Sequence, residues 1–160
     1  GGQASVVKFL KEKKLSCGVY FSYFYLTALA RAGERTFVYY LMMTDEPHEL
    51  QGPKGPVTIR GYWNQMLEEG ATTCFESWSK ELKWNTSLCH PWASAPIPIF
   101  IGEILRLRPA QPGWKEVSLS PPTDLDFPDF HLKFTTVNGP VEVICEEGEV
   151  RLNKLPSLHT

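Results

Sequence analysis

The sequence predicts an α+β chain in two parts, with helical hairpins first and a small antiparallel sheet after them. Apolar residues recur at helical spacing through most of the first hundred residues, whereas beyond residue 114 apolar and polar side chains alternate. The dipeptide Asn138-Gly139 separates two of the alternating runs and is typical of a hairpin turn. We therefore place the helical part at residues 1–108 and the β part at residues 109–160.

The first predicted elements form a helical hairpin. Residues 19–32 carry apolar and aromatic side chains on most faces and are followed by Gly33, which favours a helix packed on several sides and ended by a glycine. Residues 34–43 continue as a second apolar helix after a tight turn. The segment 46–56 contains three prolines and two glycines, so we expect a loop there.

Two further helices are predicted before the β part. One covers residues 62–69 and ends at Gly70. A hydroxyl of Thr72 or Thr73 can then cap a short helix, which would place Glu76 in its first turn, where the helix dipole favours an ionised carboxylate. The other covers residues 96–107, beginning with prolines that a first turn tolerates.

The β part is predicted from alternation and from turn residues. Asn138-Gly139 gives a strong hairpin signal and Glu147-Gly148 a weaker one. The runs that alternate, and that we expect to be strands, are 114–120, 131–137, 141–145 and 149–152.

Charge and hydropathy exclude several classes of partner. The net charge is −2, and the longest basic run, Lys8 to Lys14, is best explained as a solvated helix face. We therefore predict no nucleic-acid or anionic-membrane partner. No apolar run reaches the roughly 18 residues needed to span a bilayer. The compartment stays open between the cytoplasm, which we favour, and a periplasmic or secreted parent protein.

The four cysteines show neither a CxxC pair nor the spacing of a disulfide framework, so buried thiols are expected. Cys74, Cys89 and His90 could gather around zinc, but a fourth ligand at a familiar spacing is missing. We predict no metal and no cofactor.

The most informative segment is GATTCFESW, Gly70 to Trp78, which is followed by HPW at His90 to Trp92. It combines a carboxylate, Glu76, with an imidazole and several indoles. Sugars have flat C–H faces beside hydroxyl groups, so their sites need aromatic surfaces and a few orienting polar groups. The pattern favours a sugar pocket.

Each of these residues also has a structural interpretation. Glu76 could simply stabilise the start of a helix, and His90 could be a core or capping histidine beside Pro91. Trp63, Trp78 and Trp92 could belong to the core instead of a pocket, because large aromatic residues serve both purposes.

The stretch from Gly61 to Pro96, GYWNQMLEEGATTCFESWSKELKWNTSLCHPWASAP, resembles the end of the catalytic domain of bacterial α-L-rhamnosidases. The shared pattern is a Trp-containing helix, Gly-Ala-Thr-Thr, two variable residues, Glu, one residue and Trp, then Ser-Leu, Cys-His and a Trp near Ser-Ala-Pro. These enzymes are six-hairpin glycoside hydrolases, in which an (α/α)6 barrel precedes a β-sandwich domain. The resemblance therefore implies the last hairpins of such a barrel and a small β-sandwich-like domain.

The resemblance also implies roles for the site residues. The family inverts configuration at the sugar, and its matching glutamate is the general base, so Glu76 takes that role. His90 matches a histidine that hydrogen-bonds rhamnose, and Trp63, Trp78 and Trp92 are candidates to wall the pocket. The expected ligand is a rhamnose-containing glycoside or oligosaccharide.

The family's general acid has no counterpart here. It belongs to an earlier acidic motif, and no segment before Gly61 matches that motif. Inverting glycosidases need two carboxyl groups, one to protonate the leaving oxygen and one to activate water. We therefore expect a C-terminal fragment, inactive alone, whose partner is the missing N-terminal part of the barrel.

Two alternatives remain open. The chain could be a non-catalytic carbohydrate-binding or packing domain that uses its aromatic residues for recognition. It could also belong to a six-hairpin glycosidase with another sugar specificity, because a fold does not determine its substrate.

Overall fold

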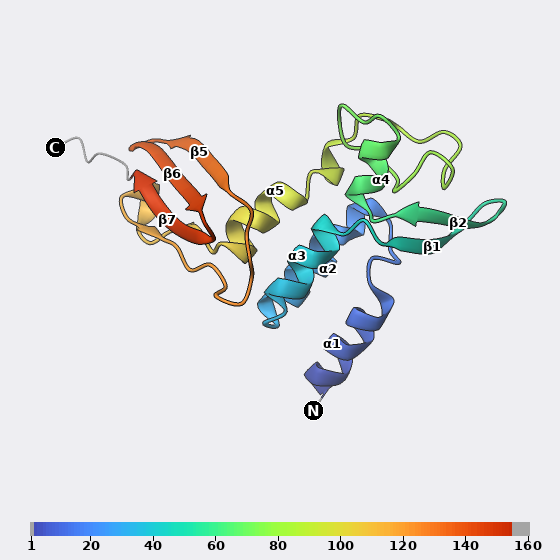
Figure 1. Cartoon of the computed structure of the whole chain (residues 1–160), viewed down its shortest axis with the longest axis horizontal. Coiled ribbons are helices and arrows are strands. Elements are labelled where there is room, and N and C mark those ends of the chain that lie inside the picture. Colours follow the sequence, from blue (N-terminus) through green and yellow to red (C-terminus); the bar gives the residue numbers. More distant parts are fainter. Residues whose placement is uncertain (1, 155–160) are drawn as a thin grey trace. The chain divides into compact units, whose positions relative to one another are not determined.

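The computed structural model describes residues 2–154, and over that range the chain is α+β, with five α-helices and three small antiparallel sheets (Figure 1). It divides into two compact units, unit 1 ending at Phe100 and unit 2 beginning at Ile101. The α-helices are α1 (Gly2–Lys13), α2 (Val19–Arg31), α3 (Arg35–Met43), α4 (Trp63–Glu68) and α5 (Pro96–Ile99). The strands are β1 (Pro47–Gly52), β2 (Gly55–Arg60), β3 (Arg108–Pro109), β4 (Val117–Ser118), β5 (Phe130–Thr136), β6 (Gly139–Glu146) and β7 (Glu149–Lys154).

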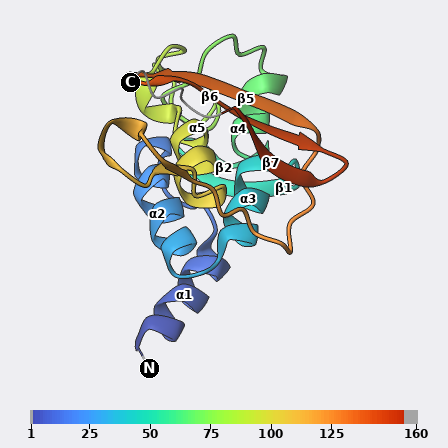
Figure 2. The same ribbon diagram turned by 90° about the vertical axis from the view of Figure 1, so that its left-hand side faces the viewer.

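The predicted helical hairpin is confirmed as α2 and α3, which lie side by side in both views (Figures 1 and 2). Gly33 has a φ of 100°, its N–H donates to the Ala30 carbonyl at 3.2 Å, and the Glu34 N–H donates to the Leu29 carbonyl at 3.0 Å. This pair of bonds is a Schellman motif, which needs a left-handed residue and therefore favours glycine. The hairpin turn is thus encoded locally.

The predicted loop over residues 46–56 is wrong, because this segment begins the antiparallel hairpin of β1 and β2. Its prolines are tolerated because a two-stranded sheet consists only of edge strands. Gly52 pairs with Gly55 across the turn, and Ile59 of β2 is fully buried. Ile59, together with the half-buried Leu50 and Val57, therefore packs the hairpin onto the rest of unit 1.

The core of unit 1 is continuous from α2 to α5. Gly70 ends α4 with a second Schellman motif, in which the Ala71 N–H donates to the Met66 carbonyl at 2.9 Å. The fully or almost fully buried side chains include Leu26, Leu29, Leu41, Ile59, Tyr62, Met66, Phe75, Trp78 and Ile99. They fix α4 against the hairpin and so position the segment that follows it.

The helix predicted over residues 96–107 is shorter than expected. It starts at Pro96 as α5 and continues as a π-helical segment, Phe100–Ile104. Beyond that segment, the Leu107 N–H donates to the Ile101 carbonyl at 2.9 Å, across six residues instead of the four of an α-helix. The wider π turn and the early end were not predicted.

Unit 2 contains the predicted small antiparallel sheet, in the order β5-β6-β7. The Asn138-Gly139 hairpin is confirmed, since Thr136 pairs with Gly139 across the turn. The strand expected over residues 114–120 is reduced to β4, which pairs only with the two residues of β3. Val141, Val143 and Cys145 share the buried face of β6. The barrel hairpins and a packed second sheet stay predictions.

Candidate functional site

The motif residues lie in an irregular loop, residues 71–90, which we call the motif loop. Two backbone hydrogen bonds close it: the Glu76 N–H donates to the Ser87 carbonyl at 2.8 Å, and the His90 N–H donates to the Cys74 carbonyl at 2.8 Å. The Thr73 hydroxyl donates to the Leu88 carbonyl. The two halves of the sequence motif are therefore joined to each other directly.

The short helix predicted to carry Glu76 does not form. Its capping hydroxyl, Thr73, binds Leu88 instead, and the Phe75 N–H points to the Met66 sulfur at 3.4 Å. The N–H groups of Phe75 and Glu76 therefore have partners far along the chain instead of within a helical turn. The helix dipole therefore does not act on Glu76.

The Glu76 carboxylate is held at both oxygens. Lys83 Nζ donates to Oε1 at 2.5 Å, and the Ser87 N–H donates to Oε2 at 3.1 Å. The Lys83 hydrogen bond, followed by the Ser87 hydrogen bond, lowers the pKa of Glu76 below its usual value of 4.5. The side chain keeps 19% of its surface exposed. Glu76 is thus an ionised, oriented carboxylate at the edge of solvent.

His90 stacks on Trp92, with 3.8 Å between the ring centres and 18° between the ring planes. Its Nδ1 atom is buried and has no hydrogen-bond partner among the residues that the structure describes. The His90 charge also contributes, less than Lys83, to the lowered pKa of Glu76. The two predicted polar residues therefore lie near enough to influence each other electrostatically.

Trp63 and Trp78 pack against each other edge to face, at 4.8 Å between ring centres. Trp78 is only 3% exposed, and its indole N–H donates to the Cys17 carbonyl at 2.7 Å. The Trp63 indole N–H donates to the Ala93 carbonyl at 2.8 Å. Trp78 belongs to the core of unit 1, whereas Trp63 is only half-buried. The role of Trp78 as a pocket wall stays a prediction, and little of its ring surface is left to serve it.

Two shallow hollows lie beside the predicted site residues. Trp63 lines one of about 230 Å³, together with residues 71–74 and two side chains of α4. Trp92 lines another of about 430 Å³, whose other wall comes from α2. Neither Glu76 nor His90 is among the residues lining these two hollows. The structure thus brings Glu76 and His90 together in the motif loop but distributes the indoles around it.

The sequence did not identify Lys83 and Ser87, the partners of Glu76, or the aromatic residues of α2. A lysine seven residues after a glutamate in a loop carries no recognisable signal. The sequence of α2 does contain a recognisable signal, because a helix that is apolar on most faces is expected to pack on several sides. Here its outer face is exposed, with Tyr20 at 53% and Phe24 at 49%.

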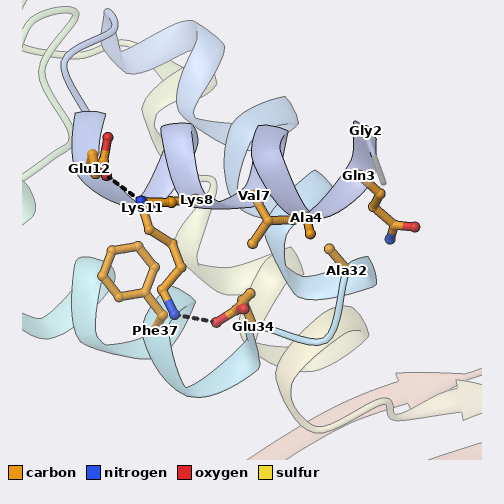
Figure 3. Close-up of a pocket in the computed structure, with 10 residues that line it drawn as sticks. All are labelled: Gly2, Gln3, Ala4, Val7, Lys8, Lys11, Glu12, Ala32, Glu34 and Phe37. Atoms are coloured by element: carbon orange, nitrogen blue, oxygen red, sulfur yellow. Dashed lines mark hydrogen bonds and ion pairs between the residues drawn. The ribbon is translucent and has the colours of Figure 1, made fainter.

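A larger hollow, of about 1080 Å³, lies between α1 and the turn that joins α2 to α3 (Figure 3). Lys11 Nζ is 2.7 Å from Glu34 Oε2 and 5.2 Å from the centre of the Phe37 ring. Lys8 faces Glu12 at 4.0 Å. Because its charges neutralise one another and α1 has no buried residue, this hollow is better explained as the seam beside a surface helix than as a ligand site.

Other site classes have little support in the described part of the chain. Residues 2–154 hold no group of three or more metal-ligating side chains, and the four cysteines are free thiols. Within the same residues, none of the helices has the length and apolar character that a membrane span requires.

The chain matches no protein-family model, and no curated protein matches it significantly. The motif and the geometry of the motif loop are therefore the features that bear on function.

Proposed function

We propose that the chain is the C-terminal part of an inverting α-L-rhamnosidase-like glycoside hydrolase, with Glu76 as the general base. The observation that carries the proposal is the direct bonding between the Glu76 and His90 segments, which the sequence separates by more than ten residues. This bonding supports the proposal because it brings the two halves of the motif into one loop. In this proposal His90 orients the rhamnose, as the matching histidine does in the family that the motif resembles.

The state of Glu76 suits a base. An ionised carboxylate offers about four acceptor positions, and the Lys83 and Ser87 bonds use two of them. The remaining positions can hold the attacking water, since part of the side chain is exposed. A lowered pKa keeps the group deprotonated at neutral pH, as a general base requires. Lys83 fixes the carboxylate orientation.

The reaction needs a second carboxyl group to protonate the leaving oxygen. In this proposal the general acid comes from preceding hairpins of the same barrel, which are also the macromolecular partner of this chain. The proposal therefore requires that hydrolysis depend on both parts.

The test is complementation. The 160-residue chain is mixed with a chain that carries the preceding hairpins, and hydrolysis of 4-nitrophenyl α-L-rhamnoside is followed. Activity is expected only in the mixture, and Glu76→Gln is expected to lower it by several powers of ten. Glu81→Gln, an exposed carboxylate of the same loop, is the matched control and should leave activity intact. Hydrolysis at ordinary enzyme rates by the isolated chain would refute the proposal.

A second candidate is a non-catalytic carbohydrate-binding or packing domain. The observation that favours it is the double engagement of Glu76 within its own loop, which a purely structural carboxylate would also show. This candidate predicts that Glu76→Gln leaves sugar affinity and parent activity nearly unchanged once the variant is folded. A six-hairpin glycosidase of another specificity is distinguished by comparing aryl rhamnoside with other aryl glycosides.

A further inference from the structure

A series of hydrogen bonds connects β2, through α4, with the middle of the motif loop. The Arg60 N–H donates to Gln65 Oε1 at 2.8 Å, and the Gln65 amide donates to Glu69 Oε1 at 2.9 Å. The other oxygen of Glu69, Oε2, accepts the Lys80 N–H at 3.0 Å. Because Gln65 uses its oxygen toward β2 and its nitrogen toward Glu69, it fixes the direction in which the Glu69 carboxylate points.

Glu69 holds the motif loop through its backbone as well as through its side chain. Its carbonyl accepts a hydrogen bond from Lys80 Nζ at 2.8 Å, and the same ammonium group lies 5.3 Å from the centre of the Phe75 ring. Burial raises the pKa of Glu69, but the hydrogen bonds that the carboxylate accepts lower it by more. Glu69 is therefore an ionised carboxylate that anchors one residue of the loop at two points.

The anchored residue belongs to a turn, residues 79–82, that leads directly to Lys83. A backbone hydrogen bond of 3.2 Å joins the first and last residues of this turn. Its first residue, Ser79, is only 2% exposed, so the turn is fixed on its inner side. Lys83 follows at once, and its Nζ atom donates to Glu76 Oε1 at 2.5 Å. The position of the turn thus determines where the ammonium group of Lys83 can reach.

Two charged side chains, Lys83 and His90, act on the pKa of Glu76, and Lys83 acts more strongly. Only Lys83 lies next to the turn that Glu69 anchors. His90 is held from the other half of the loop, by the bond from its N–H to the Cys74 carbonyl. A change at Glu69 should therefore reach Glu76 through Lys83.

We infer that Glu69 is a positioning residue for the proposed general base, because it holds the 79–82 turn where Lys83 can orient the Glu76 carboxylate. The inference rests on the proposed function for the role of Glu76. It goes beyond that function by assigning the orientation of the base to a residue outside the motif loop.

The test is a carbon-detected NMR titration of Glu76 in the 160-residue chain. Glu69→Gln leaves one accepting atom where the carboxylate offers two, so the bond from Gln65 or the bond from Lys80 is lost. The turn then loosens, the hydrogen bond from Lys83 weakens, and the pKa of Glu76 is expected to rise toward 4.5.

Glu68→Gln is the matched control. Glu68 is the neighbouring carboxylate of α4, its side chain is 48% exposed, and it pairs with Arg60 at 3.6 Å. This variant should leave the pKa of Glu76 unchanged. Equal effects of Glu68→Gln and Glu69→Gln would overturn the inference.

A double-mutant cycle shows whether the effect passes through Lys83. In a Lys83→Met background, Glu69→Gln should have no further effect on the pKa of Glu76, because both changes act on one contact. A rise of the same size with and without Lys83 would contradict the inference. Gln65→Met, which removes the bond that orients Glu69, is a second variant for which the same rise is expected. An unchanged pKa in that variant counts against the inference even if Glu69→Gln does not fold.

The complemented enzyme separates this inference from the proposed function. Glu69→Gln is expected to lower kcat/KM roughly tenfold and to move its acid limb to higher pH, since that limb reports the pKa of the base. If Glu76→Gln abolishes hydrolysis but Glu69→Gln leaves the acid limb in place, the inference fails and the proposed function stands. If the mixture does not hydrolyse the rhamnoside but the titration shows the Lys83-dependent rise, the proposed function fails and the positioning of the carboxylate stands.

Discussion

We expect Gly61→Ala, which adds a single methyl group, to lower the stability of unit 1 strongly. Its φ is 62°, a left-handed conformation, and an added Cβ would lie 1.8 Å from the Thr44 carbonyl oxygen. The same joint is held by the Gly61 N–H, which donates to the Glu46 carbonyl at 2.8 Å, and by Asn64, whose amide donates to the Met43 and Thr44 carbonyls at 2.9 Å each. Gly61→Ala must therefore shift backbone that is bonded from several sides.

The cost follows from these contacts. An alanine in the left-handed region costs about 1 kcal/mol. Relieving the contact with Thr44 breaks about two of the joint's hydrogen bonds, at about 1 kcal/mol each. We expect a loss of about 3 kcal/mol in the free energy of unfolding of unit 1. For a unit of this size, that loss lowers Tm by roughly 12 °C or more.

Gly70→Ala is the matched control, because Gly70 has a φ of 80° but no atom within 4 Å of the added Cβ. It should cost only the conformational term, about 1 kcal/mol. Urea unfolding followed by tryptophan fluorescence measures both variants, since Trp63, Trp78, Trp84 and Trp92, four of the five tryptophans, belong to unit 1. Equal losses for the two variants would show that the Thr44 contact is not as described and that the reasoning is wrong.

Three further predictions follow from unit 1. Trp78→Phe removes the hydrogen bond to the buried Cys17 carbonyl and some of the core packing, and should cost about 2 kcal/mol in urea unfolding; an unchanged midpoint contradicts it. Burial, and then the Lys14 charge, lower the pKa of His48 below 6.5, so stability is full above pH 6.5 and falls as the pH decreases below it. His48→Phe keeps the stack on Tyr62 and should flatten this decline in Tm; an unchanged slope excludes His48 as its source. Lys83→Met should raise the pKa of Glu76 in a carbon-detected NMR titration, and a pKa that stays in place would remove Lys83 as its main cause.

The elements that the sequence predicted correctly are those whose signals are local. Gly33 ends α2 through bonds to residues within one turn, and Asn138-Gly139 forms a hairpin within four residues. Such features do not depend on the rest of the chain. The segment 46–56 forms a hairpin in spite of its prolines, because Pro47 and Pro56 lie in the edge strands of a two-stranded sheet and Pro53 lies in the turn.

The candidate site was predictable in its residues but not in its geometry. The prediction that Glu76 lies in a helical turn assumed that nearby N–H groups bond along the chain. They bond instead to Ser87 and Met66, which a pattern of local propensities cannot anticipate. The predicted helical turn also implied that a helix dipole would lower the pKa of Glu76. The main cause is instead the hydrogen bond from Lys83. The ionised state was right and its physical origin was wrong.

The two interpretations of Glu76 can be separated because they connect stability and activity differently. In Glu76→Gln the new amide can accept a hydrogen bond through one atom only, so the Lys83 or the Ser87 bond is lost and the motif loop is weakened in either case. A structural carboxylate therefore predicts that the complemented enzyme loses activity only in proportion to the fraction unfolded, and that activity returns on cooling well below Tm. A general base predicts a loss of several powers of ten in fully folded enzyme, at every temperature. Measuring activity and unfolded fraction on the same sample, across a range of temperatures, shows whether Glu76 only stabilises the motif loop or acts as the general base.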